Sequence, residues 1–514
     1  MSIFEKFFPG LAAKRIRAET SLKREKHIAV ITEQYMNYSQ HGASTRKNAF
    51  KTLDDNLYTA DEDIGNNKEI LMARSRQCFM GNAIARAAIN KIRTNVVGDG
   101  LKLKSKIDNR ILNLKFEERE RIENEIQTIW TLWAESTECD IERQVDFYQL
   151  QSLALMTQLL DGDCFVTLPF RNRAKEFFEL KVKLIDGSRC CSPCTTDDNI
   201  KNGVEVDKDG SPIAYWFVKD EKTWEFQRVA SHSPSGRKNV IVLMDRERIG
   251  QKRGVPLLAP VLETLLQLTR FTNAELMNAV VSSLYTAFIT SATDNQSQTT
   301  VDGAFIDKYE GRNGEAKEDI YMGSGVIQSL APGENVVFAD PKRPNGNFEI
   351  FMMAMCKELG AALEIPVEVL LSSFNASYSA SKASLEEVWK MYNMRRSWLA
   401  RNFCQPIFEE LMDEAVEKGY IKLPGYFENP LKRKAYLSAE WYGQAQGQID
   451  PLKEVKASVM KIEYGLSTGA REARLLNGSD FQENIEQQTT EAKLKQKLKA
   501  MKKGGKQQNV STGE

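Results

Sequence analysis

The feature that most restricts the fold is a pair of helical patterns separated by a polar insertion, all within residues 249–385. A Gly-Gln-Lys-Arg-Gly-Val-Pro turn at 250–256 leads into residues 261–289, where apolar side chains recur at helical spacing. A helix of that length reaches roughly 45 Å at about 1.5 Å per residue. A second helical pattern begins near Phe348 and ends near Ile365, because Pro366 disfavours helix at the residue before it. The first helix is therefore predicted to be a rod that bridges two regions.

The insertion between these helices is polar and acidic. Residues 290–319 lose the apolar period and carry seven acidic against three basic side chains. A short strand is predicted at 325–330, followed by an Ala-Pro-Gly turn at 331–333.

Composition narrows the class of protein. The chain has 514 residues, enough for two or three packed regions, and its 70 basic and 70 acidic side chains cancel. It is therefore not a polycation that coats nucleic acid along its whole length. Eight cysteines without regular pairing, and no secretory signal at 1–17, predict reduced thiols in an intracellular compartment. No apolar run reaches the roughly 20 residues of a membrane span.

The flanking regions predict an α+β fold with several regions. Helices are expected at 68–97, 117–136 and 146–160, and strands at 101–103, 164–170, 177–185, 203–206 and 213–218. Trp130 and Trp133 share one helix face, and the Asp-Gly pair that ends the turn at 207–210 predicts a hairpin.

Both ends of the chain read as loosely attached. The apolar and basic pattern at 4–17 favours a flexible arm that docks on a neighbouring subunit or is removed during maturation, over a membrane-surface helix. The tail from 437 predicts short helices and loops, and seven lysines within 491–506 predict a solvated, disordered end.

A serine-rich segment at 372–382 lies between two helical stretches, where exposed loops tend to carry function. The next helix is predicted over 383–419, with a capping box at Ser384-Leu-Glu-Glu387 and a bend at Pro406.

Catalytic and metal-binding motifs are scarce. The Cys-Cys-Ser-Pro-Cys stretch at 190–194 has half of a zinc-knuckle spacing, without a second cysteine pair or a histidine nearby. No P-loop is present, so the sequence gives no ground for an ATP-hydrolysing motor. Asp161 and Asp163 flank a glycine, a pattern more typical of a turn than of an acid/base pair, and His232 has no Gly-x-Ser-x-Gly partner.

Several short stretches carry a resemblance in their order and spacing, over about four fifths of the chain from 74 to 481. They are Asn-Lys-Ile-Arg-Thr-Asn-Val-Val-Gly-Asp-Gly at 90–100, Trp130 and Trp133 with Cys-Asp-Ile at 139–141, Leu-Asp-Gly-Asp at 160–163, Gly-Val-Glu-Val-Asp at 203–207 with Ala-Tyr-Trp-Phe at 214–217, Arg-Gly-Val-Pro-Leu-Leu-Ala-Pro at 253–260, Leu-Ala-Pro-Gly-Glu at 330–334, Ile-Pro-Val-Glu at 365–368, Ser-Tyr-Ser at 377–379 and Ile-Asp-Pro-Leu-Lys-Glu at 449–454. Together they resemble tailed-bacteriophage portal proteins of the lambda family.

The resemblance implies a phage portal fold, with a wing of mixed helices and β-sheet, two long stem helices, a clip insertion and a helical crown. Mapped by order, the regions are an N-terminal arm at 1–60, wing at 61–260, first stem helix at 261–290, clip at 291–347, second stem helix at 348–370, tunnel loop at 371–382, long helix and wing return at 383–436, crown at 437–490 and lysine-rich tail at 491–514.

The resemblance also implies a ring, usually of twelve subunits, at one capsid vertex, through which double-stranded DNA is packaged and ejected. The expected partners are the terminase large subunit, the major capsid protein, a scaffold or protease, and the head–tail adaptor. It implies a virion component assembled in the host cytoplasm, with no cofactor, metal, catalytic residue or membrane contact.

Two sets of site residues follow. A channel that lets DNA slide should attract its phosphates weakly, which suits hydroxyls, one amide and a single lysine. The predicted channel residues are Ser372, Ser373, Asn375, Ser377, Tyr378, Ser379, Ser381 and Lys382. The predicted partner-facing clip residues are Asp294, Asp302, Asp307, Glu310, Glu315, Glu318 and Asp319.

Alternatives remain open at this stage. The clip acids either repel DNA or bind basic partner surfaces, or they only solubilise the insertion. For the whole chain, the alternatives are another capsid or tail structural protein without a DNA conduit, and a DNA-acting or proteolytic enzyme that uses Asp161, Asp163 and His232.

Overall fold

The computed structural model describes the chain in segments and divides it into two compact units. The described residues are 14, 17–26, 47–53, 56–193, 199–220, 224–284, 288–291, 334–337, 347–374, 377–447 and 450–508. The units are Met1–Glu62 and Asp63–Glu514. In the first unit residues 17–26 are helical and η2 (Asn48–Phe50) is a 3-10 turn. Most of the predicted amphipathic pattern at 4–17 lies outside the described residues.

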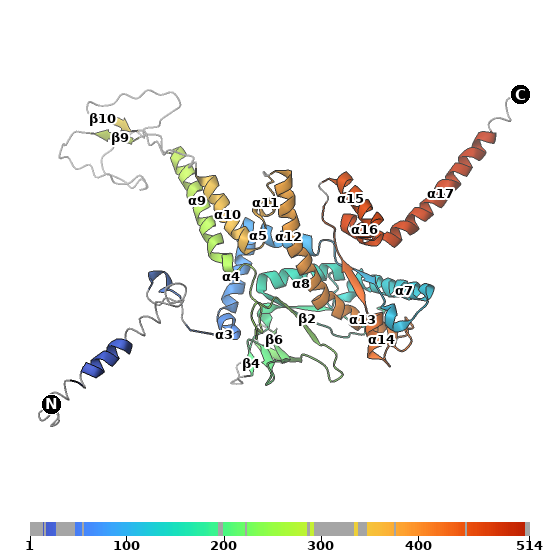
Figure 1. The fold of residues 1–514 in the computed structure, drawn as a ribbon, viewed down its shortest axis with the longest axis horizontal. Helices are drawn as coiled ribbons and strands as arrows, with labels where there is room; N and C mark the ends of the chain where they lie inside the picture. The colour runs from blue at the N-terminus through green and yellow to red at the C-terminus, as the bar shows by residue number, and fades with distance from the viewer. Residues whose placement is uncertain are drawn as a thin grey trace, which may run out of the picture. The chain divides into compact units, whose positions relative to one another are not determined.

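Helices make up most of the second unit (Figure 1). In chain order the α-helices are α3 (Ala60–Gly65), α4 (Lys68–Gly81), α5 (Ala83–Val96), α6 (Asn109–Leu112), α7 (Phe116–Ala134), α8 (Phe147–Asp161), α9 (Leu262–Leu284), α10 (Phe348–Ala362), α11 (Val367–Leu370), α12 (Tyr378–Leu399), α13 (Gln405–Glu417), α14 (Pro430–Tyr436), α15 (Pro451–Glu463), α16 (Gly469–Asn477) and α17 (Phe481–Gln508). Short 3-10 turns are η3 (Thr137–Cys139), η4 (Gly187–Arg189) and η5 (Ala259–Val261).

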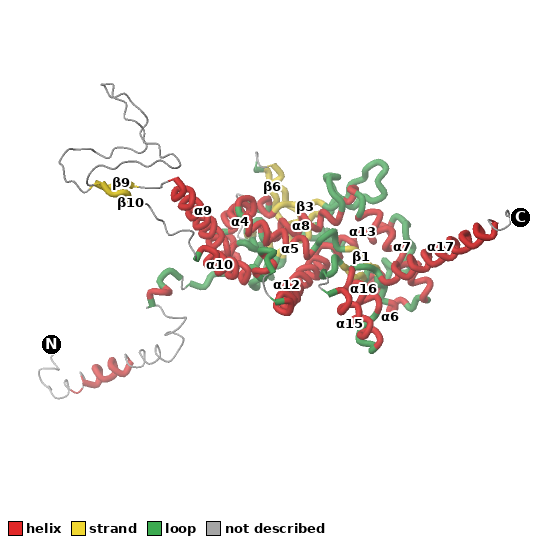
Figure 2. The backbone as a smooth tube through the Cα atoms, turned by 90° about the horizontal axis from the view of Figure 1, so that it is seen from above, coloured by secondary structure: helices red, strands yellow, loops and turns green. Residues whose placement is uncertain are grey.

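The strands form small sheets beside these helices (Figure 2). They are β1 (Lys102–Ser105), β2 (Asp163–Thr167), β3 (Lys183–Asp186), β4 (Ile200–Lys201), β5 (Val204–Val206), β6 (Pro212–Asp220), β7 (Glu225–Ala230), β8 (Val240–Met244), β9 (Phe288–Ser291), β10 (Glu334–Val337) and β11 (Ala439–Tyr442). Their antiparallel orders are β3-β2-β8, β4-β5-β6-β7, β1-β11 and β10-β9. The predicted α+β class is confirmed.

The main core forms around α5, α8 and the α12–α13 helices, with α7 packed against it. Asn82 begins α5 because its side chain accepts hydrogen bonds from the backbone N–H groups of Ile84 and Ala85. Trp130 on α7 is almost fully buried, with its ring centroid 4.9 Å from that of Phe147 on α8. Trp133 is buried beside it, so the predicted shared face of the two tryptophans is confirmed.

A hairpin joins β5 and β6, as the Asp-Gly pair predicts. The backbone N–H of Asp207 donates to the carbonyl of Ser211 at 2.9 Å, and Gly210 has a φ of 79°, which glycine adopts without strain. The strand predicted at 177–185 is shorter in the structure, where β3 begins at Lys183 and Leu180 forms only an isolated bridge with Phe170.

The long helix predicted over 261–290 ends early. Helix α9 stops at Leu284, and residues 288–291 form β9, which pairs with β10 at the other end of the insertion. The prediction of helix through Ile289 was therefore wrong, since the run Phe-Ile-Thr at 288–290 has the aromatic and β-branched residues that favour strands. At 23 residues, the helix reaches roughly 35 Å. The strand predicted at 325–330 lies outside the described residues.

The helix after the serine-rich segment starts earlier than predicted. Helix α12 begins at Tyr378, with Ser377 as its N-cap, so Ser384 lies inside the helix and the predicted capping box is wrong. Before the predicted bend at Pro406, residues Ala400–Cys404 form a π-helical turn, η6. A π turn of this kind accommodates a proline that cannot donate a helical hydrogen bond.

The lysine-rich end also differs from its prediction. Helix α17 runs to Gln508, so the disorder predicted from residue 491 is contradicted for residues 491–508. Lysine, glutamate, glutamine and alanine are good helix formers, and Lys495 pairs with Glu491 one turn away at 3.5 Å.

Candidate functional site

Helices α9 and α10 form an antiparallel pair at the two ends of the insertion, and they lie side by side in both views (Figures 1 and 2). Phe271 joins them, with ring centroids 5.6 Å from Phe348 and 4.6 Å from Phe351. The Thr272 hydroxyl lies 3.7 Å from the sulfur of Met352. At the foot of α9 the side-chain amide of Asn82 donates to the Thr269 hydroxyl at 2.9 Å. The pair is thus fixed to the helical core at one end and carries the insertion at the other.

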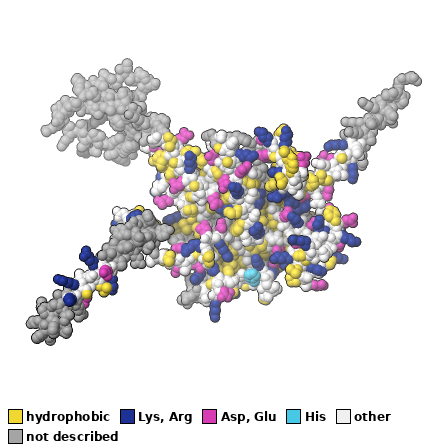
Figure 3. Space-filling model, in the orientation of Figure 1, with side chains coloured by type: hydrophobic (Ala, Val, Ile, Leu, Met, Phe, Trp, Pro, Cys, Tyr) yellow, Lys and Arg dark blue, Asp and Glu magenta, His cyan; other side chains and the backbone are white. Residues whose placement is uncertain are grey.

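The apolar stripe of α9 continues beyond the core. Leu265 and Leu268 are buried, whereas Leu276 and Val280, one and two turns after Thr272 on the same stripe, are 62% and 45% exposed. Met277 is 60% exposed beside them, and hydrophobic side chains reach the surface over both helices (Figure 3). The apolar stripe of α9 is therefore buried where the helix packs on the core and exposed beyond Thr272.

The segment that follows α10 is held at its base by α11. Val367, Val369 and Leu370 are buried in the main core, and the chain then turns at Ser372, whose φ of 55° is left-handed. The Lys91 ammonium on α5 donates to the Ser372 hydroxyl at 2.6 Å. The exposed turn of the predicted channel segment is therefore anchored on a buried helix.

The structure brings together only part of the predicted channel set. Ser372, Ser373 and Ser377 are exposed in the turn, whereas Ser379, Ser381 and Lys382 belong to α12. The boundary predicted at Lys382 was therefore wrong, because Ser377 already caps the helix. Asn375 and the side chain of Tyr378 lie outside the described part.

Lys382, the single lysine of the predicted channel set, has a carboxylate neighbour. Its ammonium lies 3.7 Å from the carboxylate of Glu454 on α15. Sequence reasoning missed Lys91, which supplies the cation at Ser372, because 281 residues separate the two.

A buried ion cluster, defined here as Lys68, Asp163 and Arg253, fixes the entry into α9. The Asp163 carboxylate lies 2.9 Å from the Lys68 ammonium and 2.7 Å from Arg253 Nε, and accepts the Gly254 N–H at 3.0 Å. Arg253 also donates at 2.6 Å to three backbone carbonyls, those of Gly187, Cys190 and Asn202. These contacts tie α4, β2, η4 and the β4–β5 turn to the turn before α9.

The charges of the ion cluster stabilise one another and hold the surrounding segments together. Burial alone would raise the pKa of Asp163, but Arg253 and Lys68 outweigh it and hold that pKa below its usual value. Burial lowers the pKa of Lys68, opposed by Asp163. Every charged atom is committed to a partner, which leaves Asp163 unsuited to proton transfer.

Asp161 lies at the end of α8, outside the ion cluster. Arg76 binds it in a bidentate manner at 2.8 and 2.7 Å and also contacts Asp186. Gly162 between the two aspartates has a φ of 89° and caps α8. The turn predicted at 161–163 is confirmed. Sequence reasoning missed Lys68, Arg76 and Arg253 as partners of these acids, because the partners are far apart along the chain: 85 residues separate Arg76 from Asp161 and 90 separate Arg253 from Asp163.

Of the other candidate residues, His232 lies apart from the ion cluster, whereas Cys190 contacts it through its backbone carbonyl, which accepts from Arg253. His232 sits between β7 and β8, where its Nδ1 is 3.0 Å from the Ser231 hydroxyl, and no described contact joins it to Asp161 or Asp163. Burial raises the pKa of the Cys190 thiol to about 12, and Cys194 lies outside the described residues. In the described segments no group of three His, Cys, Asp or Glu side chains is placed to hold a metal ion.

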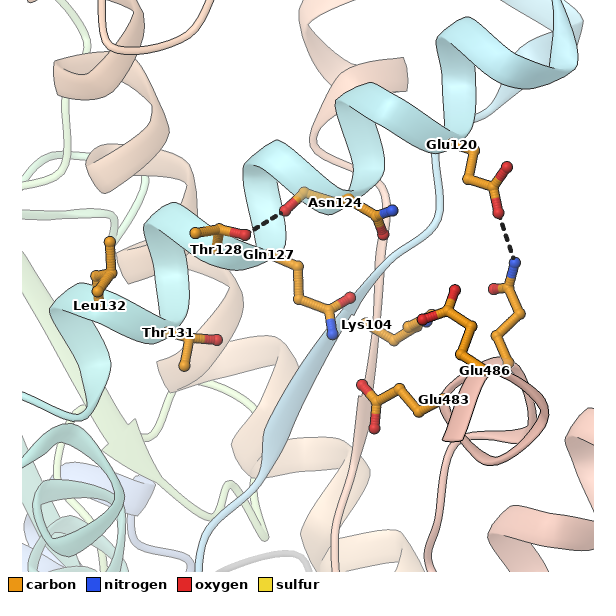
Figure 4. Close-up of a pocket in the computed structure, with 10 residues that line it drawn as sticks. Lys104, Glu120, Asn124, Gln127, Thr128, Thr131, Leu132, Glu483 and Glu486 are labelled. Atoms are coloured by element: carbon orange, nitrogen blue, oxygen red, sulfur yellow. Dashed lines mark hydrogen bonds between the residues drawn. The ribbon is translucent and has the colours of Figure 1, made fainter. Parts of the chain in front are cut away.

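A polar cavity of about 380 Å³ separates α7 from α17 (Figure 4). Lys104, Glu120, Glu483 and Glu486 contribute its charges, and the Gln482 amide donates to Glu120 at 3.2 Å. Its described lining has no cluster of cations or nucleophiles, so the cavity is a polar gap beneath the start of the C-terminal helix.

The predicted clip residues cannot be placed. Asp294, Asp302, Asp307, Glu310, Glu315, Glu318 and Asp319 all lie outside the described residues. The pairing of β9 with β10 brings together residues 291 and 334, so the two ends of the insertion meet at its base. Among the described helices none combines the length and apolar character needed to cross a membrane.

Comparison with known proteins shows which family the chain belongs to. The model of the phage portal protein, lambda family, matches residues 46–396. Portal protein B of Escherichia phage lambda is 27% identical over 440 residues, or 82% of each chain, and the portal protein of Escherichia phage N15 is 26% identical over 444 residues, or 82% of this chain and 83% of that one. A solved chain from the neck of a native gene transfer agent particle, determined with C12 symmetry, aligns over 80% of this chain and 94% of its own at 12% identity, with a TM-score of 0.44. Because the family model spans more than half of the sequence, the chain belongs to the lambda family of phage portal proteins.

Proposed function

We propose that copies of this chain close into a ring, of twelve subunits, at one capsid vertex and surround a channel through which double-stranded DNA enters and leaves. The observation that carries the proposal is the family match over 46–396, which includes the α9–α10 pair and most of the segment that follows. The family is a structural one, and the proposal gives the chain no catalytic step. The work of moving DNA belongs to a partner, the terminase large subunit.

The contact between neighbouring copies is assigned to the α9–α10 pair. Leu276, Met277 and Val280 on α9 and Ile350 on α10 are all at least 45% exposed. Burying such side chains against a second copy contributes about 1.5–3 kcal/mol each when burial is complete. A closed ring uses the same contact at every interface and leaves no end uncovered.

The segment 371–377 and the first turn of α12 are proposed to face the DNA. The hydroxyls of Ser372, Ser373 and Ser377 offer short hydrogen bonds to phosphate without fixed charge, and Lys91 adds one cation at the turn. A ring of such groups holds the duplex loosely, which suits a conduit through which DNA must slide.

The insertion beyond β9 and β10 is proposed as the clip that contacts the terminase and later the head–tail adaptor. Its charge excess, seven acids against three bases over 290–319, favours basic partner surfaces. The major capsid protein and a scaffold or protease are proposed partners during assembly in the host cytoplasm, with the mature ring in the virion.

Negative-stain microscopy of the purified chain tests the ring. We expect closed rings with an axial hole wide enough for duplex DNA. A protein that stays monomeric under assembly conditions would sink the proposal. Rings or sheets without a through-hole would favour the alternative, a capsid or tail structural protein without a conduit.

The channel segment has its own test. Replacing residues 372–376 with a glycine linker of equal length removes the exposed hydroxyls of Ser372 and Ser373 but spares the Ser377 cap and α12. We expect intact rings with reduced packaged-genome yield. Glycine substitution of the shorter exposed turn 233–236 is the control, and normal yield from the 372–376 variant would contradict the assignment.

A further inference from the structure

The two larger sheets pack face to face through a small core of their own. Phe165, Ile185, Tyr215 and Phe217 belong to this core and are buried. At one end of the sheet pair lies a cleft of about 400 Å³, lined by β2, β3, β6, β7 and the loop before β8. None of the channel or insertion residues lines it.

At the cleft, cationic side chains take the place of the apolar side chains that fill the rest of the layer between the two sheets. Ile185 and Lys183, two apart on the regular strand β3, share a face and line the cleft, and Phe217 and Lys219 of β6 line it too, with Lys219 at an irregularity of the strand. Facing sheets normally bury apolar side chains at such positions. The end of this layer is instead basic over an apolar floor.

The described lining of the cleft contains no acidic residue. Its five cationic side chains are Arg171, Lys183, Arg189, Lys219 and Arg237. Two of them have carboxylate partners, Lys219 with Glu225 at 3.0 Å and Arg237 with Glu410 at 2.5 Å.

The other three cations have no carboxylate partner among the described residues. Arg189 is half-buried and donates only to the backbone carbonyls of Val218 and Lys219, at 2.7–3.1 Å. The side chains of Arg171 and Lys183 have neither a hydrogen bond nor an ion pair in the described part of the chain. A half-buried cation without a counter-charge raises the local potential and favours an anionic ligand.

We propose that this cleft binds a short extended segment of a partner protein in which carboxylate side chains alternate with aliphatic ones. The carboxylates meet Arg171, Lys183 and Arg189, and the aliphatic side chains rest on the floor formed by Ile185, Phe217 and Val229. Charge complementarity supplies the orientation and the apolar floor supplies area.

The dimensions favour a peptide over a nucleic acid. A volume of about 400 Å³ lies in the range of sites that hold a few side chains, roughly 300–1,000 Å³. Duplex DNA, whose major groove alone is about 12 Å wide, cannot enter it. The half-apolar floor distinguishes the cleft from a site for a free inorganic anion, which needs polar donors on all sides.

Fluorescence anisotropy on the full chain tests the proposal. The labelled ligand is an extended peptide of about ten residues in which glutamate alternates with alanine and leucine. Its counterpart has glutamine at every glutamate, and a single-stranded oligothymidylate of the same charge represents nucleic acid. We expect the glutamate peptide to bind, to weaken as salt is added, and to bind more tightly than both counterparts.

Arg171→Gln with Lys183→Gln removes the two cations whose side chains make no hydrogen bond or ion pair within the described chain, so the fold should be kept. We expect this double variant to bind the glutamate peptide about tenfold more weakly. Lys208→Gln, at an exposed residue of the β5–β6 turn, is the matched control and should bind as the unaltered protein does. Absence of binding, equal binding of the glutamine peptide, tighter binding of the oligothymidylate, or no effect of the double variant each overturns the proposal.

Discussion

The buried ion cluster and the α9–α10 pair lie at opposite ends of the same helix and are stabilised in opposite ways. In the cluster, Asp163, Lys68 and Arg253 satisfy one another and nearby backbone groups within a single chain. At the far end of α9, Leu276 and Val280 remain exposed although they continue a buried stripe. The start of α9 is thus fixed within one chain, whereas its distal half presents exposed apolar side chains, which the proposed ring would cover.

The largest effect on stability is expected from Asp163→Asn, which removes the negative charge of the buried ion cluster. The substitution leaves Lys68 and Arg253 buried without their counter-charge, which costs about 3–5 kcal/mol of unfolding free energy. Urea unfolding followed by tryptophan fluorescence measures it. Glu225→Gln, in an exposed ion pair with Lys219, is the control and should cost less than about 1 kcal/mol. Equal losses for the two variants would show that the cluster is not a stabilising joint.

Gly254→Ala perturbs the packing next to the buried ion cluster without changing any charge. An added Cβ would meet the carbonyl oxygen of Gly162 at 1.8 Å, so the turn before α9 must move away from α8. We expect a loss of about 1–3 kcal/mol in the same urea experiment. Gly81→Ala, where a Cβ meets nothing within 4 Å, is the matched control and should be neutral or mildly stabilising. An unaffected Gly254→Ala protein would mean that this close approach is easily relaxed.

Met277→Glu tests whether the exposed distal half of α9 contacts a neighbouring copy. Met277 is 60% exposed in the monomer, so the fold should keep its stability to within about 0.5 kcal/mol. A charge at a contact between copies should nevertheless weaken each interface by about 1–3 kcal/mol. Size-exclusion chromatography with light scattering should then show loss of rings. Leu132→Glu, at a 70% exposed side chain on the outer face of α7, controls for added charge, and rings that survive Met277→Glu would remove this face of α9 from the interface.

The contrast also separates what the sequence predicts from what it does not. Local patterns were sufficient for the stripe of α9, the Asp-Gly hairpin before β6 and the shared face of Trp130 and Trp133, because each depends on residues a few positions apart. The ion cluster was beyond reach, since Lys68 and Asp163 are brought together only when α4 packs beside β2. The pairing of β1 with β11, from opposite ends of the second unit, was hidden for the same reason.

Errors at element ends have local physical causes. Serine at 377 and serine at 384 are both plausible helix caps, and only the structure shows that the backbone turns at the first. The lysines after residue 491 raised the net charge of the tail, which indicated disorder, whereas their helix propensity favoured α17. For the candidate site, the position of the exposed serine turn was predictable, but its cation, Lys91, was not.

Asp161 offers the finest test, because its effect is confined to a narrow range of pH. Burial raises the pKa of Asp161 to about 6, with Asp186 adding to the shift and Arg76 opposing it. The unfolded value is about 3.9, so between the two values the folded state holds the proton more tightly and gains stability as pH falls. The unfolding free energy of the unaltered protein should therefore rise relative to Asp161→Asn by up to about 1.4 kcal/mol per pH unit from pH 6 towards pH 4. Asp163 acts with the opposite sign but is present in both proteins and cancels, whereas the pKa of Asp186 is held low against burial partly by its hydrogen bond to Asp161, so the difference reports on these two coupled carboxylates together. Urea unfolding at several pH values measures the difference, Asp207→Asn controls for loss of an exposed carboxylate, and a difference that stays flat or shrinks on acidification would place the Asp161 proton elsewhere.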